Sequence, residues 1–295
     1  VQNSFSLPLA DGSHGAFTWS HYDKLLTDPH LYRSAWNSVV FALLSTVIAL
    51  LMGGLLAWVV ERTNAPLRGL AYLTTVISMG MPFILYVLSW IYLFGRAGPF
   101  NDIYRRISGS QDLLVNVHSM GGMVMIEAFA WVPLVFLLFS ATFRSANAEM
   151  KEAARVSGAT LVEMIRRISL RLARPAMLAT ALFVFIRSLE AFDVPTLIGR
   201  PAKINLLTSD IFFSIRAVPP DIGHASAFSV VLTIVIAVLM YFYGRIARNA
   251  DRYATVTGKG FRPRPLDLGW ARWLGGALVV FVFLVVLALP MVALA

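Results

Sequence analysis

One charged loop interrupts an otherwise apolar chain, and it holds the residues best able to do chemistry in water. Residues 144–174 carry seven Lys or Arg side chains, together with the carboxylates of Glu149 and Glu152. Charge at this density cannot remain in hydrocarbon, so the loop must project into water and meet something there. A carboxylate such as that of Glu152 can anchor a partner through charge-assisted hydrogen bonds.

The sequence does not support a catalytic function. The chain has no cysteine, which excludes disulfides, thiolate metal sites and cysteine nucleophiles. The Gly258-Lys259 pair is followed by Gly260 in place of Ser or Thr, so it is not a phosphate-binding loop. We therefore expect no catalytic residue, no metal ligand and no cofactor bound by this chain. The histidines, none with paired ligand spacing, are at 14, 21, 30, 118 and 224.

Composition indicates a membrane protein. Hydrophobic residues make up 58% of the chain, charged residues only 14%, and the mean hydropathy is +0.70. A helix needs about 20 apolar residues to cross about 30 Å of hydrocarbon. Six stretches qualify, so the predicted fold class is all-α, a polytopic transmembrane helical bundle. They are 36–60, 70–94, 121–143, 175–197, 225–244 and 273–295.

Some residues inside or beside these stretches have special roles. Pro82 and Pro133 lie within predicted spans and are expected to kink or break them. Four tryptophans near span ends suit the aromatic belt at the membrane interface. They are Trp36, Trp131, Trp270 and Trp273.

The distribution of basic residues predicts orientation. Three connecting loops carry sixteen Lys or Arg residues and the other three segments carry eight, so the first set is placed in the cytoplasm. This topological role also accounts for the net charge of +9, and we expect no nucleic-acid partner. The basic loops are 61–69, 144–174 and 245–272, and the external segments are 1–35, 95–120 and 200–224.

The two ends suggest a piece of a longer protein. The chain starts at Val1 and stops inside an apolar run at Ala295. We expect segment 1–35 to form an external loop and interfacial helix, preceded by a spanning helix. Residues 36–247 would be the transport core, 248–272 a cytoplasmic linker and 273–295 the first span of a second unit.

The order of residues in the charged loop resembles a known signature. Glu152-Ala153-Ala154, three residues, Gly158, nine residues, then Ile168 and Leu170 is similar to the cytoplasmic loop of bacterial ABC-importer permeases. Arg171 stands where that family usually has proline. The alternative interpretation of the loop is an amphipathic basic helix that lies on anionic lipid, as in an integral-membrane enzyme or sensor, but it does not account for this order of residues.

The resemblance implies a partner for each side of the membrane. The loop would dock on a dimer of cytoplasmic ABC ATPases, which bind and hydrolyse ATP-Mg. A periplasmic substrate-binding protein, a second permease unit and the lipid of the bacterial inner membrane complete the expected contacts. The implied coupling residues are Glu149, Glu152, Ala153, Ala154, Gly158, Ala159, Ile168 and Leu170.

Two further segments indicate a branch of this family. Residues 22–37 and 182–199 resemble permeases that import ferric iron, polyamines or aminoethylphosphonate. In the iron-type branch two units are often fused through a Gly- and Arg-containing linker, which residues 257–264 resemble. The resemblance implies ferric iron as substrate, with polyamine or aminoethylphosphonate as alternatives.

Four charged residues fall inside predicted spans. Facing lipid, each would cost about 2.5–3.5 kcal/mol, so they must face the bundle interior, a cavity or an interface. Arg187 and Glu190 are three residues apart and can simply pair on one helix face. Alternatively, the acidic members line a path for a cationic or metal-bearing substrate. The four candidates are Glu127, Arg187, Glu190 and Asp193.

Overall fold

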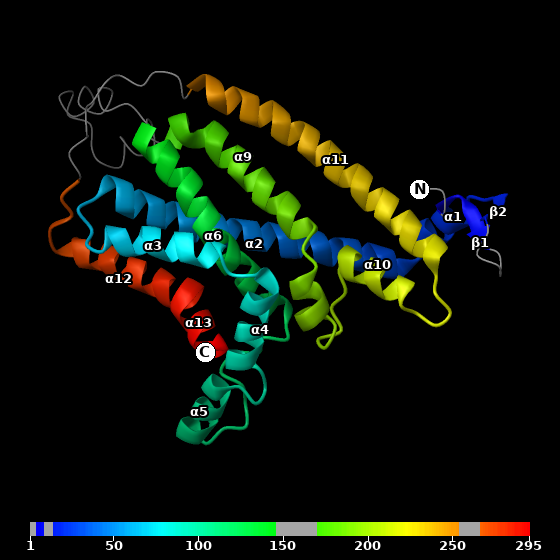
Figure 1. Cartoon of the computed structure of the whole chain (residues 1–295), viewed down its shortest axis with the longest axis horizontal. Helices are drawn as coiled ribbons and strands as arrows, with labels where there is room; N and C mark the ends of the chain where they lie inside the picture. Colours follow the sequence, from blue (N-terminus) through cyan, green and yellow to red (C-terminus); the bar gives the residue numbers. More distant parts are fainter. Residues whose placement is uncertain (1–3, 9–13, 146–169, 254–265) are drawn as a thin grey trace. The chain divides into compact units, whose positions relative to one another are not determined.

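Helices make up most of the chain that the computed structural model describes (Figure 1). A short antiparallel hairpin, which the sequence did not predict, pairs β1 (Ser6–Pro8) with β2 (His14–Phe17). The structure describes residues 4–8, 14–145, 170–253 and 266–295. The chain divides into two compact units: unit 1 is Val1–Ser45, Trp90–Glu127 and Phe185–Tyr241, and unit 2 is Thr46–Ser89, Ala128–Val184 and Phe242–Ala295.

Unit 1 contains the segments that the charge distribution predicts to be external. Its short helices are amphipathic elements between the long ones, and Gly109, with φ of 68°, ends the second of them. A small core of Leu25, Leu31, Ala227 and Phe228 ties the first short helix to two long helices. The short helices are α1 (Ser20–Thr27), α5 (Pro99–Ser108) and α10 (Leu207–Ile215), and the long ones are α2 (Pro29–Arg62) and α11 (Ile222–Tyr253).

Unit 2 is held together by close helix packing. A Cβ atom placed on Gly53 of α2 would lie 2.8 Å from the Cβ of Val135, on α6 (Met120–Ser145). A Cβ on Gly275 would likewise lie 2.8 Å from that of Ala65. Gly53 lets α2 approach α6 closely, which is the usual way in which helices associate within a bilayer. Gly275 lets its helix approach the connection between α2 and α3, in which Ala65 lies.

Gly275 belongs to the C-terminal helical segment, which packs against α3 (Arg68–Met79) in unit 2. This segment begins with a 3₁₀ turn and contains one π-helical turn. Its elements are η4 (Gly269–Ala271), α12 (Arg272–Phe283), η5 (Leu284–Ala288) and α13 (Leu289–Leu294).

Five helical segments within the described ranges are long and apolar enough to cross a membrane, which agrees with the predicted polytopic all-α class. One of them, Phe83–Ser108, starts and ends later than the predicted stretch 70–94. The others are Pro29–Arg62, Met120–Arg144, Ala225–Arg248 and Gly269–Leu294.

The two prolines inside predicted spans behave differently. The stretch 70–94 is broken: α3 ends at Met79 and α4 (Phe83–Phe94) begins directly after Pro82, as predicted. The turn is closed by the Gly80 N–H, which donates to the Ile77 carbonyl over 3.1 Å. Pro133 does not break its helix, because α6 runs without interruption from Met120 to Ser145.

The predicted continuous span 175–197 is wrong at its C-terminal end. Helix α9 (Leu170–Leu189) stops before Glu190, and three non-helical residues follow it. Helix resumes at Asp193 and leads into a π-helical turn, η3 (Pro195–Gly199). Pro195 is the first residue of η3, where its missing amide hydrogen costs little, and Val194 before it is itself helical, with φ of −62° and ψ of −51°. The interruption is stabilised from outside, since the Thr208 hydroxyl donates to the Ala191 carbonyl over 2.7 Å.

The contact at Gly275 gives a test of how α12 is held. We expect Gly275→Ala to destabilise the protein by about 1–3 kcal/mol, because the new methyl group overpacks against Ala65 and Val59. Gly244→Ala is the matched control, since a Cβ there meets nothing within 4 Å. Thermal unfolding in detergent measures both; equal midpoints for the two variants would contradict the proposed packing.

Candidate coupling and transport sites

The predicted coupling loop is described only at its two ends. Glu149, Glu152, Ala153, Ala154, Gly158, Ala159 and Ile168 lie outside the described residues, and Leu170 is the first residue of α9. The coupling role of these residues therefore stays a prediction. The loop leaves α6 at Ser145 and enters α9 at Leu170, and both helix ends belong to unit 2.

A three-residue polar cluster lies beside the point where the loop leaves α6. The Tyr72 hydroxyl donates a hydrogen bond to Glu61, and an Arg144 guanidinium N–H donates to the Tyr72 oxygen over 2.8 Å. The Arg144 Nε also lies 3.5 Å from a carboxylate oxygen of Glu61, and its guanidinium sits 5.3 Å from the centroid of the Tyr72 ring. Three helices, α2, α3 and α6, are thus joined by one polar cluster.

A second contact in unit 2 links two of the predicted cytoplasmic loops. Thr63 and Leu266 form an isolated parallel bridge, in which the Leu266 N–H donates to the Arg62 carbonyl over 2.8 Å. Asn64 donates from its side chain to Asp267, and the Gly269 N–H donates to the same carboxylate over 2.9 Å. These two hydrogen bonds lower the pKa of Asp267, the Gly269 bond more strongly.

The four charges predicted inside spans all belong to unit 1. Arg187 and Glu190 form an ion pair of 2.6 Å, so the predicted pairing is confirmed. Glu127 is buried in α6 with only 1% of its surface exposed. Asp193 is half-buried, two residues before η3. The structure thus brings Arg187 and Glu190 together, buries Glu127 and partly buries Asp193.

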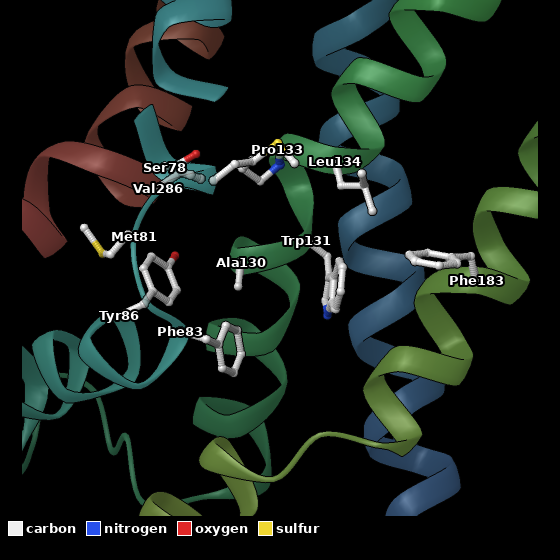
Figure 2. A pocket seen from close by; sticks show the side chains of 11 residues that line it. Ser78, Met81, Phe83, Tyr86, Ala130, Trp131, Pro133, Leu134, Phe183 and Val286 are labelled. Atoms are coloured by element: carbon white, nitrogen blue, oxygen red, sulfur yellow. The ribbon is translucent and has the colours of Figure 1, made fainter. Parts of the chain in front are cut away.

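A cavity of about 320 Å³ lies within unit 2, at the break between α3 and α4 (Figure 2). Four aromatic rings contribute to its wall, and Trp131 and Phe183 meet edge to face with centroids 6.2 Å apart. Among the residues that the structure describes, none of those lining it is Asp, Glu, Lys, Arg or His. The lining residues are Ser78, Met79, Met81, Phe83, Tyr86, Ala130, Trp131, Pro133, Leu134, Phe183 and Val286.

The sequence pattern missed this cavity. Trp131 was assigned to the interfacial belt, but it lines the cavity, whereas Trp36, Trp270 and Trp273 are each at least 63% exposed, as a belt requires. Pro82 and Pro133 were the available signals, because they mark the helix break and the neighbouring helix that form the wall. Which side chains converge there depends on tertiary packing, and periodicity does not report it.

His30, in unit 1, has two polar neighbours from the same unit. His30 is 3.5 Å from Asp210, and the Asn205 side-chain amide lies 3.2 Å from the other ring nitrogen of His30. Within the described ranges, no group of three His, Asp or Glu side chains is arranged to hold a metal ion.

Three features characterise the chain as a polytopic membrane transport component. They are the long apolar helices, the helix break beside a cavity, and the basic loops that belong to one unit. The chain belongs to the family of binding-protein-dependent transport system inner membrane components, whose model matches residues 34–255. It is therefore a permease subunit of an ABC importer in the inner membrane, which works with an ATPase and a substrate-binding protein and is not itself the catalytic subunit.

Relatives of this chain differ in what they carry. It is 25% identical to the sulfoquinovosyl glycerol transport system permease protein SmoG of Agrobacterium fabrum, over 84% of this chain and 82% of that protein. It is 21% identical to the ferric transport system permease protein FbpB of Actinobacillus pleuropneumoniae, over 83% of this chain but only 35% of that protein. The chain thus spans about a third of the ferric relative.

The fold matches a solved importer. A crystal structure of a bacterial ABC transporter involved in the import of the acidic polysaccharide alginate superimposes with a TM-score of 0.67 and 18% identity, over 84% of this chain and 87% of that chain. At this identity the match establishes the fold of the permease and leaves its substrate open.

The Asp267 contact is testable by titration. Because its folded pKa is lowered, the contact stabilises the folded state above the ordinary value of 3.8 and is lost as pH falls through the lowered pKa. We expect Asn64→Ala to raise the Asp267 pKa towards 3.8, measured by carboxyl ¹³C NMR in micelles. Asn116→Ala, in segment 95–120, should leave it unchanged. An Asp267 pKa already at 3.8 in the unsubstituted protein would contradict the described hydrogen bonds.

Proposed function

We propose that loop 144–174 is the element through which this permease is driven by its ATPase. The observation that carries the proposal is the order of Glu152-Ala153-Ala154, Gly158, Ile168 and Leu170 between the ends of α6 and α9. Small side chains at Ala153 and Ala154 permit close approach of a partner. Glu152 supplies one charged hydrogen-bond anchor in that contact.

The opposite face would receive the substrate-binding protein. Segments 1–35, 95–120 and 200–224 carry fewer basic residues and contain α1, α5 and α10, all in unit 1. On this proposal, the binding protein delivers substrate to unit 1 and the ATPase acts on the loop that emerges from unit 2. The alternative of a lipid-binding enzyme or sensor loses its support, because the family match identifies a transport component.

Ferric iron is the substrate favoured by the sequence resemblance. Ferric permeases are among the relatives, and the acidic side chains of Glu127, Glu190 and Asp193 suit a cationic or metal-bearing cargo. The relative's greater length is consistent with a second fused unit beginning at 273–295, and polyamine or aminoethylphosphonate remain alternatives within the same branch.

A carbohydrate-like organic solute is the second candidate, and the cavity of unit 2 favours it. Its wall offers aromatic faces from Phe83, Trp131 and Phe183 with a few polar atoms, such as the hydroxyls of Ser78 and Tyr86 (Figure 2). A mostly apolar pocket with a few placed polar groups is typical of sites for organic ligands. The A. fabrum relative is named for a sugar-derived solute.

The coupling proposal is tested by retention of the ATPase. We expect Glu152→Ala to lose an anchor and Gly158→Pro to deform the turn, so that each reduces co-purification of the ATPase at least tenfold. Asp112→Ala, an acidic residue in segment 95–120, is the control and should retain it. Full retention in both loop variants, with normal membrane insertion, would assign the ATPase contact elsewhere.

The substrate proposals are separated by two variants. Neutralising two carboxylates in Glu190→Gln/Asp193→Asn should reduce uptake of radioactive ferric iron at least fivefold if they line its path. Trp131→Ala should instead reduce uptake of a sulfosugar glycoside by a similar factor, since it removes one aromatic face. Unchanged iron uptake in the double variant, at equal expression, would remove the acidic path.

A further inference from the structure

We infer that Glu61, Tyr72 and Arg144 form a clamp that transmits movement of the coupling loop to the cavity of unit 2. In this inference, which rests on the proposed function of the loop, the three side chains act as positioning residues. They fasten the helix that ends at the loop to the two helices beside it.

The clamp is built around one hydroxyl group. The Tyr72 oxygen accepts a hydrogen bond from Arg144 over 2.8 Å while its proton is donated to Glu61. Only 12% of the Glu61 side chain is exposed, and burying a carboxylate is costly unless it is paired and hydrogen-bonded, as this one is. Arg144 is the partner with access to water, since 60% of its side chain is exposed.

The position of Arg144 relates the clamp to the loop. Arg144 is one residue before Ser145, where α6 ends and the loop begins. A displacement of the loop therefore acts first on the last turn of α6. Because Arg144 is bonded to Tyr72 and paired with Glu61, that turn cannot shift independently of α3 and the end of α2.

Two helices lead from the clamp to the cavity. Tyr72 and the cavity residue Ser78 are on the same helix, α3, six residues or about 9 Å apart. Arg144 and the cavity residue Leu134 are both on α6, ten residues or about 15 Å apart. A helix is stiff over such lengths, so motion at the clamp changes the spacing of two cavity walls.

A role in stabilising the fold alone explains the three clamp residues less well than a role in transmitting movement. A partly buried ion pair adds little net stability, because desolvation offsets the Coulomb attraction, but its geometry specifies one arrangement of the groups it joins. Arg144 could also serve only as a positive charge that fixes membrane orientation. That role would need neither the Tyr72 hydroxyl nor the Glu61 carboxylate.

The test measures how accessible a cysteine placed in the cavity is to a thiol reagent. It uses the assembled permease–ATPase complex in lipid nanodiscs. Ser78→Cys introduces the only cysteine of the chain, which otherwise has none. Its labelling rate with a maleimide is measured without nucleotide and after trapping with ATP and vanadate. We expect the two rates to differ at least fivefold with the clamp intact and less than twofold in Tyr72→Phe, which keeps the ring and removes the hydroxyl.

Control variants distinguish transmission from structural damage. Arg68→Ala removes another basic side chain of unit 2, whose Nε donates to the Ala65 carbonyl over 3.3 Å, and should keep the fivefold difference. Arg144→Glu should abolish the difference, and the charge exchange Glu61→Arg/Arg144→Glu should restore at least half of it. ATPase retention should be normal in Tyr72→Phe and Arg144→Glu.

The possible outcomes are separable. A fivefold difference that persists in Tyr72→Phe and Arg144→Glu would overturn the clamp. So would loss of ATPase retention in Tyr72→Phe, which would make the cluster part of the docking surface. Retention of the ATPase in Glu152→Ala would instead count against the proposed function of the loop. The labelling rates in Tyr72→Phe and Arg144→Glu would still decide for or against the clamp.

Discussion

The backbone of a chain in lipid has no water to hydrogen-bond with, and most of this structure follows from that constraint. It requires long helices, and it permits a helix to stop inside the bundle only where other groups satisfy the freed backbone. At the break after α3, Gly80 and Met81 donate to the carbonyls of Ile77 and Ser78. The cavity of unit 2 is lined from both sides of this break.

The same constraint governs charge. Arg187 and Glu190 neutralise each other over 2.6 Å, and Glu61 is bonded to Tyr72 and paired with Arg144. The first pair is local to the end of α9, whereas the second contact joins α2, α3 and α6 and so restricts which of these helices can move apart. The polar contacts near the ends of helices therefore determine which parts of a transport protein move together.

Hydrophobic length predicted much of this architecture. It located the long helices, and the rigid φ angle and missing amide of Pro82 predicted the break after α3 correctly. For Pro133 the same argument predicted a kink or a break, and no break occurs, because α6 continues from Met120 to Ser145. The end of α9 was also missed, since a local hydropathy window does not register that Thr208 stabilises the carbonyl of Ala191.

The sites were harder to predict than the helices. The pair Arg187–Glu190 is local in sequence and was foreseen, whereas Tyr72 and Arg144 are 72 residues apart and meet only through tertiary packing. Trp131 shows the same limit, because composition cannot distinguish an interfacial ring from one lining a cavity. The coupling residues from Glu149 to Ile168 remain predictions of the sequence.

The bridge between Thr63 and Leu266 also restricts the C-terminal helical segment. Leu266 is bonded to the backbone of Arg62 and Asn64, and Asp267 accepts hydrogen bonds from the Asn64 side chain and from the Gly269 N–H. Backbone and side-chain bonds therefore fix the entry to η4 and α12 against the end of α2. A shift of α2 along its axis would carry the start of α12 with it.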